Sequence, residues 1–221
     1  MTGKLAQIIV LLGAPGAGKG TVAQYLKSKY DVCHFSTGNL LRNEIQEGTN
    51  LGMKVKGIVA SGGLVGDDVI NEIVEKNLGE TVGGCSIVVL DGYPRTRRQA
   101  EVLDGMTSGK LKALIRVVEL SIDREALISR LSQRLVCSEC GNTYGPKDGK
   151  STCSCGGGLI KRKDDEESTI RERFRKYEEE TLPVSSYYGD RLVKVSGSGT
   201  PDEVAQSVDG VLCSFGIEKR R

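Results

Sequence analysis

Apolar residues gather in five short runs along the chain, and longer mixed stretches separate them. The first run, residues 5–12, is almost entirely apolar, which is typical of a strand covered on both faces. Further runs predict strands at 32–35, 86–90, 113–120 and 191–195. The stretches between them are long enough to hold crossover helices, which parallel strands require. The pattern therefore predicts an α/β fold with a five-stranded parallel sheet flanked by helices.

The last helix has clear signals at both ends. Thr200 is placed as its N-cap, Pro201 occupies the first helical position, and Glu203 completes a capping box. Gly216 marks the end. The apolar residues between them fall on one face and predict a packing helix: Val204, Val208, Val211, Leu212 and Phe215.

Two stretches interrupt the alternation of strands and helices. Residues 36–65 are polar and interrupted by glycine, which predicts short helices, and residues 133–165 are rich in Cys and Gly with few apolar positions. We interpret both as insertions at the rim of the sheet. The remaining segments, 1–35, 66–132 and 166–221, would then form the core domain.

Charge and hydropathy narrow the classes of partner. The 221 residues include 31 Lys and Arg against 29 Asp and Glu, a formal net charge of +2, so no strong field favours nucleic acid or an anionic membrane as the main partner. No apolar run approaches the roughly 20 residues that span a bilayer. The first residues lead into a strand without a signal-peptide cleavage site, so we expect a cytoplasmic protein.

A glycine-rich loop follows the first predicted strand. Residues 13–19 have the Gly-x4-Gly-Lys spacing of a P-loop, in which backbone N–H groups at a helix N-terminus bind phosphate. Taken alone, the spacing also fits a glycine-rich turn that binds nothing, but its place between a buried strand and a helix favours phosphate binding. The candidate nucleotide-binding residues here are Gly13, Gly16, Ala17, Gly18, Lys19, Gly20 and Thr21.

Several segments resemble one enzyme family. Gly-Ala-Pro-Gly-Ala-Gly-Lys-Gly-Thr at 13–21 resembles the phosphate loop of the adenylate kinases, including the shifted Gly-Thr ending. Val-Val-Leu-Asp-Gly-Tyr-Pro-Arg at 88–95, followed by Gln99, is similar to the family signature. Ser-Thr-Gly at 36–38 with Arg42, and Arg-Lys-Asp-Asp at 162–165 with Arg173, extend the similarity to nearly the whole chain.

This resemblance implies a P-loop kinase that transfers the γ-phosphoryl group of ATP reversibly to AMP, giving two ADP. The insertion at 36–65 would bind the monophosphate, and the insertion at 133–165 would be a lid over the donor. Both would close to exclude water, the competing nucleophile.

The resemblance also assigns roles to residues around the acceptor and the metal. Arg42 and Arg95 would hold the AMP phosphate, and Thr37 and Gln99 would face the adenine. Asp91 ends an apolar strand and would orient Mg²⁺ through its water shell, although a capping role alone would also explain its position. The remaining residues implied for the AMP site are Val65, Gly92, Arg162 and Arg173.

On the donor side, the resemblance implies that Arg130 flanks the ATP base and Arg134 binds ATP. The spacing of four would place these two on one face of a single helix. Arg134, Arg162 and Arg173 would clamp the transferring phosphoryl group. Without the resemblance, each arginine is explained as simply by an exposed salt bridge. The residues implied to act in catalysis are Lys19, Asp91, Arg95, Arg134, Arg162 and Arg173.

The sequence supplies no obvious general base. His34 is the one histidine and lies within a short apolar run, as an ordinary strand residue would. Phosphoryl transfer to an anionic phosphate oxygen needs no base, so the sequence leaves the role of His34 open.

Four of the seven cysteines are concentrated in the second insertion: Cys137, Cys140, Cys153 and Cys155. Four soft ligands predict a closed structural zinc site, and the arrangement resembles the zinc-bearing lid of some adenylate kinases. The span between the pairs is shorter here, and the second pair encloses one residue instead of two. Disulfides or unliganded thiols remain alternatives. Cys33, Cys85 and Cys213 lie on apolar elements and are interpreted as small core residues.

Other functions fit parts of the sequence. A kinase that uses GTP as donor, or another monophosphate as acceptor, would carry the same loop. A nucleotide-gated zinc-ribbon module that binds nucleic acid is less consistent with the near-neutral charge. No Asn-Lys-x-Asp segment supports a GTPase switch. We therefore expect ATP, AMP and ADP as the partners, with Mg²⁺ and structural Zn²⁺, no nucleic acid or membrane, and a monomer.

Overall fold

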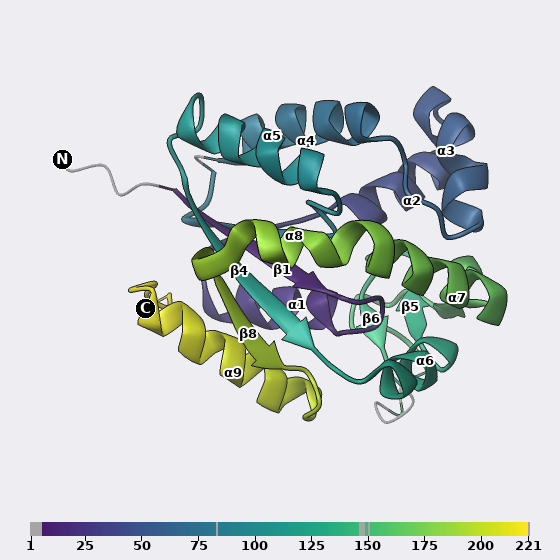
Figure 1. Ribbon diagram of the computed structural model, residues 1–221. Coiled ribbons are helices and arrows are strands. Elements are labelled where there is room, and N and C mark those ends of the chain that lie inside the picture. Colours follow the sequence, from purple (N-terminus) through teal and green to yellow (C-terminus); the bar gives the residue numbers. More distant parts are fainter. Residues whose placement is uncertain (1–5, 83, 146–148, 150, 221) are drawn as a thin grey trace.

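A computed structural model describes residues 6–82, 84–145, 149 and 151–220, and it contains a central sheet of five parallel strands (Figure 1). The strand order is β2-β3-β1-β4-β8, and every pairing is parallel, which confirms the predicted sheet. The strands are β1 (Gln7–Gly13), β2 (Val32–Ser36), β3 (Ile87–Asp91), β4 (Leu114–Ser121) and β8 (Leu192–Ser196).

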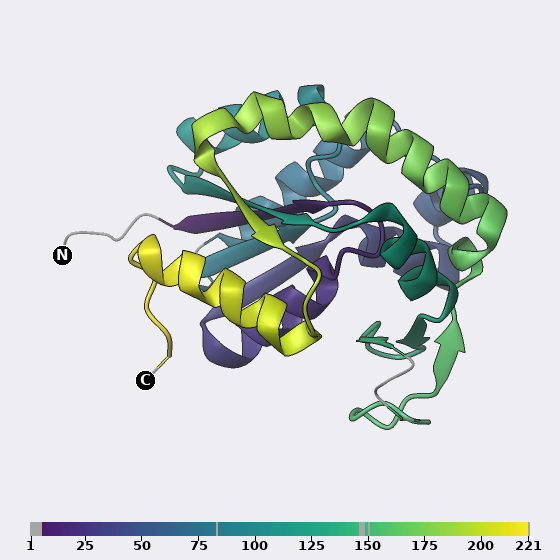
Figure 2. The same ribbon diagram turned by 60° about the horizontal axis from the view of Figure 1, so that its bottom comes forward.

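Helices connect the strands and cover both faces of the sheet. Within the described residues they are α1 (Lys19–Lys29), α2 (Thr37–Glu47), α3 (Asn50–Ala60), α4 (Asp67–Thr81), α5 (Arg97–Ser108), α6 (Arg124–Ser132), α7 (Glu167–Lys176), α8 (Leu182–Tyr188) and α9 (Pro201–Ser214). A π-helical segment, Tyr177–Thr181, joins α7 to α8, so the three form one long helical rod (Figure 2).

The alternation of side chains on β1 divides the core in two. Ile9 and Leu11 pack against α1 and α9 on one face, whereas Ile8 and Val10 pack against α4, α5 and α8 on the other. All four side chains are buried. A strand with apolar residues on both faces is stable only between two helical layers, and the three-layer arrangement follows from it.

The two interrupting stretches form separate structures at one end of the sheet. The first contains α2 and α3, with Ser36 and Thr49 as N-caps whose side chains accept backbone N–H bonds. The second contains an antiparallel sheet of β5 (Leu135–Cys137), β6 (Thr143–Tyr144) and β7 (Leu159–Lys161), in the order β6-β5-β7. Figure 2 shows this small sheet projecting from the core below α6 and α7.

The last helix agrees with its predicted ends. The Thr200 side chain accepts from the Glu203 N–H and the Glu203 side chain accepts from the Thr200 N–H, which confirms the capping box. Val204, Val208 and Leu212 of α9 are buried. The helix packs on α1, and this contact covers one face of the sheet.

The prediction that three scattered cysteines are small core residues was wrong for Cys213 and missed a bond between the other two, although Cys85 does pack against the core. Cys33 of β2 and Cys85, which comes just before β3, form a disulfide with a Cα–Cα distance of 5.9 Å. Cys213 is exposed on α9, so it is not a core residue. A hydrophobic pattern places a cysteine on an apolar element but does not say which neighbour its sulfur faces.

Some predicted segments extend beyond the described residues. These are positions 1–5, 83 and 221 of the predicted core, which include Leu5 of the first predicted strand, and positions 146–148 and 150 of the predicted lid. In the described part of the chain, no helix is both long and apolar enough to cross a membrane.

Candidate active site

The loop between β1 and α1 is built around glycines. Gly13 and Gly16 have φ angles of +140° and +85°, which side chains rarely adopt. A Cβ on Gly13 would lie 2.8 Å from the Leu120 carbonyl oxygen, and one on Gly16 would lie 2.9 Å from Leu131 Cγ. The loop must therefore pass close to β4 and α6, and it leads directly to the N-terminus of α1, where phosphate binds favourably.

Lys19 lies at the start of α1 and folds back over this loop. Its Nζ donates to the carbonyl oxygens of Gly13, at 2.7 Å, and Ala14, at 3.1 Å. Burial lowers the pKa of Lys19 to about 8, and Asp91 opposes this decrease. Arg95, Arg173 and Arg134 contribute to this lowering, so they lie near enough for their charge to reach Lys19.

Asp91 ends β3 beside this loop. Burial alone would raise its pKa, but the His34 side chain and the Lys19 ammonium outweigh burial and bring the pKa to about 2. His34 Nε2 lies 3.7 Å from Asp91 Oδ2. His34 is half-buried in β2, as predicted for a strand residue. A half-buried carboxylate that stays ionised next to a phosphate loop suits a cation such as Mg²⁺, whose ligands are oxygens and water.

Arginines from three separate segments converge opposite the loop, and two aspartates hold them. Arg134 pairs with Asp165 through Nε, at 2.7 Å, and through Nη2. Arg162 pairs with Asp164 in the same two-point manner, with its Nε at 3.0 Å and its Nη2 at 2.6 Å. Arg173 Nη1 donates to Asp165 Oδ1 at 2.8 Å and to the Asp164 carbonyl oxygen at 3.0 Å. Two acidic side chains thus fix three guanidinium groups in one place.

The arginine side chains in this cluster repel one another, because each carries a positive charge. Burial and the neighbouring arginines, among them Arg162 and Arg134, lower the pKa of Arg42 to about 9. Burial and the charge of Arg162 together lower the pKa of Arg173 to about 10. The pKa of Asp164 is lowered because the charges of Arg162 and Arg173 outweigh its burial. Like charges held this close by half-buried arginine side chains are a site for a multiply charged anion.

A pocket opens between the first insertion and the core. Arg42, Arg95, Arg162 and Arg173 lie at its charged part, and the remaining lining residues include Thr37, Gly38, Leu41, Val65, Ile70, Gly92 and Gln99. Val65, Thr37 and Gln99 are buried. The structure therefore brings together all the residues that the resemblance implied for the acceptor.

Thr37 and Gln99 are oriented by fixed partners. Thr37 Oγ1 donates to the Gly92 carbonyl oxygen at 2.8 Å, which leaves the oxygen free to accept. Gln99 Oε1 accepts from the Arg95 N–H at 2.7 Å, and its Nε2 donates to Asp67 Oδ1 at 2.7 Å. Each group retains hydrogen-bonding capacity toward the pocket, in a direction set by its partner.

One predicted helix relation was wrong. Arg130 lies on α6, but this helix ends at Ser132, so Arg134 lies beyond it and not on the same helical face. The Arg134 N–H closes a turn onto the Leu131 carbonyl oxygen at 3.2 Å, and the side chain then reaches Asp165. Arg130 Nη2 donates to the Gly199 carbonyl oxygen at 3.4 Å, away from the arginine cluster.

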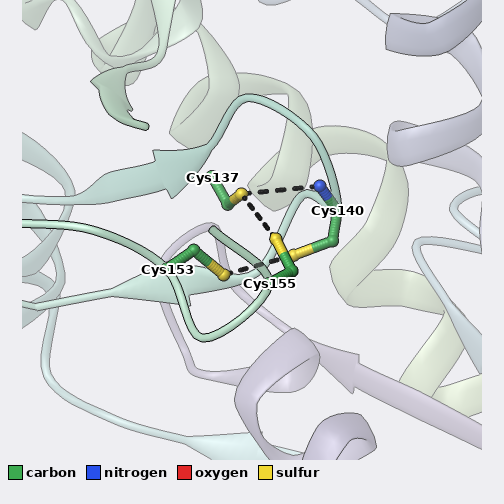
Figure 3. A group of neighbouring side chains, drawn as sticks. All are labelled: Cys137, Cys140, Cys153 and Cys155. Carbon is green, nitrogen blue, oxygen red and sulfur yellow. Dashed lines mark hydrogen bonds between the residues drawn. The ribbon is translucent and has the colours of Figure 1, made fainter. Parts of the chain in front are cut away.

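The four lid cysteines form one compact group (Figure 3). Their sulfur atoms all lie within 4.8 Å of one another, with Cys137–Cys155 at 3.5 Å and Cys140–Cys153 at 3.4 Å. A tetrahedral zinc with Zn–S bonds of about 2.3 Å has sulfur–sulfur edges of about 3.8 Å, so the four thiols fit this ion. The short Cys-x-Cys spacing therefore still brings the fourth sulfur into the group.

Backbone groups also favour thiolates in this group. The N–H groups of Glu139 and Cys140 donate to Cys137 Sγ at 3.4 and 3.5 Å. A backbone N–H of Cys155 and the Tyr144 hydroxyl lower the pKa of Cys153 to about 6. The pKa of Cys137 is also lowered, whereas burial raises the pKa of Cys140 to about 12 and neighbouring thiols raise that of Cys155. Zinc binds thiolates, so the ionised form of Cys137 and Cys153 suits a metal site.

Three acidic side chains that organise the site were not singled out from the sequence. Asp164 and Asp165 hold the arginines, and Asp67 holds Gln99. The pair Asp164-Asp165, two residues after Arg162, was a usable signal, because arginines that meet in a site need anionic partners when no ligand is bound. Nothing in the sequence around Asp67 distinguishes it from an ordinary residue in the first turn of a helix.

Comparison with known sequences gives one consistent result. Residues 11–193 match the family described as Adenylate kinase. The chain is 41% identical to Adenylate kinase of Kosmotoga olearia over 207 residues, which cover 90% of this chain and 96% of that protein. It is 40% identical to Adenylate kinase of Fervidobacterium nodosum, with coverage of 94% and 98%, and 39% identical to that of Trichlorobacter lovleyi, with 92% and 98%.

Proposed function

The chain belongs to the adenylate kinase family, and on this premise we propose that it transfers the γ-phosphoryl group of ATP reversibly to AMP, giving two ADP. The observation that carries the proposal is the position of the arginine cluster, which faces both the P-loop lysine and the acceptor pocket. A phosphoryl group passing between the two nucleotides would lie among these charges.

The arrangement suits the charge changes of phosphoryl transfer. The transferring group carries negative charge on its peripheral oxygens, and fixed positive groups stabilise it without reorganising. We assign this role to Lys19, Arg95, Arg134, Arg162 and Arg173. The acceptor is an anionic phosphate oxygen, so the reaction requires no general base.

Mg²⁺ accompanies ATP in this proposal. Asp91 would hold the ion through its water shell, and the Thr21 hydroxyl follows the P-loop at the start of α1. When bound, Mg²⁺ neutralises charge on the phosphates of the donor. Zn²⁺ would be held by the four lid cysteines and would have a structural role, because four protein ligands leave no open position.

The donor would lie along the P-loop, with Gly13, Gly16, Ala17, Gly18, Lys19 and Gly20 around its phosphates. Arg130 would lie beside its base and Arg134 beside its phosphates. The acceptor phosphate would lie against Arg42 and Arg95, within the pocket that Val65 and Gly92 line.

Adenine fits the two oriented side chains. Its amino group donates and its adjacent ring nitrogen accepts, a pattern that a glutamine amide matches in a two-point contact. The Thr37 oxygen, whose hydrogen is used on Gly92, can accept from the same amino group. Hypoxanthine reverses the pattern, because a carbonyl oxygen replaces the amino group and the ring nitrogen carries a hydrogen.

All the proposed site residues come from one chain, so we propose that the protein works as a monomer. We also propose that it acts in the cytoplasm and that neither nucleic acid nor a membrane takes part. The experiment that tests the function is a steady-state assay with ATP, GTP, CTP or UTP as donor and AMP, IMP, GMP, CMP or UMP as acceptor. We expect kcat/KM for AMP to exceed that for IMP by about tenfold to a hundredfold, because buried polar groups would be left unpaired with IMP. Equal values for AMP, IMP and UMP would contradict the adenine assignment, and activity only with another acceptor would contradict the function.

A further inference from the structure

The first cysteine pair lies in a tight turn of the lid. We call residues 137–142 the cysteine turn. The Cys137 N–H donates to the Asn142 carbonyl oxygen at 2.9 Å, and the Gly141 N–H donates to the Cys137 carbonyl oxygen at 3.1 Å. Together with the N–H groups that face Cys137 Sγ, these bonds give the turn a fixed shape.

This turn contacts the helix that follows the phosphate loop. Gln24 Nε2 of α1 donates to Asn142 Oδ1 at 2.8 Å, and both side chains are half-buried. Gln24 comes three residues after Thr21, so it lies one turn along α1 from the predicted donor-phosphate residues. The contact joins the lid to the donor side of the core.

The same turn also contacts the first insertion. A Cβ on Gly141 would lie 3.5–3.8 Å from the amide atoms of the Asn39 side chain, so the backbone of the turn lies directly against Asn39 of α2. Asn39 Oδ1 accepts a hydrogen bond from Arg42 Nη2. Asn39 is thus placed between the cysteine turn and the arginine assigned to the acceptor phosphate.

We propose that the cysteine turn couples the two nucleotide sites. By contacting Gln24 and Asn39 at once, it transmits closure of the lid over the donor to the orientation of Arg42 in the acceptor site. The turn is rigid, so it cannot leave α1 without also leaving Asn39, and a ligand that favours the closed lid therefore favours the ordered position of Arg42. Gln24, Asn142 and Asn39 are positioning residues in this account, which rests on the proposed function.

A binding measurement tests this coupling directly. AMP is titrated by calorimetry into the full-length protein, with and without saturating Mg²⁺ and a non-hydrolysable β,γ-imido analogue of ATP. The ratio of the two dissociation constants is the coupling factor, and by linkage it is the same whichever ligand is added first. We compare the unmodified chain with Asn142→Ala, Gln24→Ala and the double variant.

We expect the analogue to tighten AMP binding in the unmodified chain and each single variant to reduce the coupling factor by about threefold to tenfold, the range expected for loss of one hydrogen bond. The double variant should lose no more than the larger single loss, because both substitutions remove the same bond. Affinity for AMP without the analogue should change little.

Ser138→Ala is the matched control, since its hydroxyl lies in the same turn and, within the described residues, bonds the neighbouring Glu139 carboxylate instead of α1 or α2. This variant should keep the full coupling factor. If Asn142→Ala fails to fold, Gln24→Ala tests the same bond from α1. Unchanged coupling in Gln24→Ala, or no coupling in the unmodified chain, would overturn the inference, whereas failure to form ADP from ATP and AMP would overturn the proposed function.

Discussion

At the residue scale, the acidic partners of the arginines explain how the site exists before a nucleotide arrives. Asp164 and Asp165 hold Arg134, Arg162 and Arg173 in hydrogen-bonded pairs, so these guanidinium groups already point into the site. Electrostatic stabilisation is most effective when the charged groups need no reorganisation in the transition state. Arginine suits this position because its planar group can bond a carboxylate on one edge and a phosphate on another.

Substitution of the central cations should therefore affect turnover far more than stability. We expect Lys19→Met and Arg95→Ala each to lower kcat by about a hundredfold or more, because charge that acts mainly in the transition state is lost. Arg98→Ala is the matched control, since this arginine is exposed and pairs with Asp68 on the surface. Steady-state kinetics with circular dichroism on each variant measure both effects. Near-normal turnover in either active-site variant, with the fold intact, would contradict the assignment.

The pKa of Lys19 gives a pH dependence. A lysine with its pKa lowered to about 8 loses its positive charge as the pH rises through 8, so the free protein then attracts phosphates less. The phosphates of both nucleotides are already ionised at this pH. We expect kcat/KM for ATP, which reports the free protein, to fall above about pH 8, and kcat to fall less because bound phosphate favours the charged lysine. A profile that is flat from pH 7.5 to 9.5 would contradict this.

At the scale of elements, the cysteine lid needs a source of stability other than a hydrophobic core. In the described part of the lid, strands β5, β6 and β7 have two or three residues each, and most of their side chains are not buried. A small sheet of this kind is marginal unless a metal or a disulfide holds it. The compact sulfur group supplies the ligands for a metal.

We expect about one zinc per chain in freshly purified, reduced protein, and a lower melting temperature in Cys153→Ser or after chelation, because metal bound only by the folded form stabilises it. Loss of activity should be much smaller than in Lys19→Met, since the phosphate-binding arginines are not zinc ligands. Cys213→Ser, which changes an exposed cysteine outside the group, is the control. Substoichiometric zinc together with an unchanged melting temperature in Cys153→Ser would show that the lid is held by other contacts.

The Cys33–Cys85 disulfide constrains a different part of the chain from the lid. The two cysteines are 52 residues apart, and the segment between them contains α2, α3 and α4, so the bond closes a loop that includes the whole acceptor insertion and the following core helix. Closing a loop of this length restricts the unfolded chain and contributes about 4 kcal/mol in the chain-entropy account.

Reduction should therefore lower the melting temperature by about 10 °C. Differential scanning calorimetry with and without a thiol reductant measures this shift. In Cys33→Ser the reductant should have no such effect, while Cys213→Ser should respond as the unmodified chain does. A melting temperature that does not depend on the reductant in the unmodified chain would contradict a bond that stabilises the fold.

At the scale of the molecule, the sequence predicts the layers well because buried strands and capped helices have local signals. The apolar run around Ile8 and the capping box at Thr200 each depend on residues close in sequence. The bond between Cys33 and Cys85 and the contacts of Asp67 depend on neighbours that only the folded chain brings together. The end of α6 before Arg134 was missed for another reason, because a spacing of four residues does not show where a helix ends.

For the molecule as a whole, the central claim is that the donor and acceptor nucleotides meet across the arginine cluster. Phosphorus NMR of a mixture of ATP, AMP and Mg²⁺ with the unmodified chain tests it most directly. We predict loss of ATP and AMP in equal amounts, formation of two ADP for each pair consumed, the reverse reaction from ADP alone, and neither change with Lys19→Met. Release of inorganic phosphate in place of ADP, or no reaction in either direction, would contradict the account.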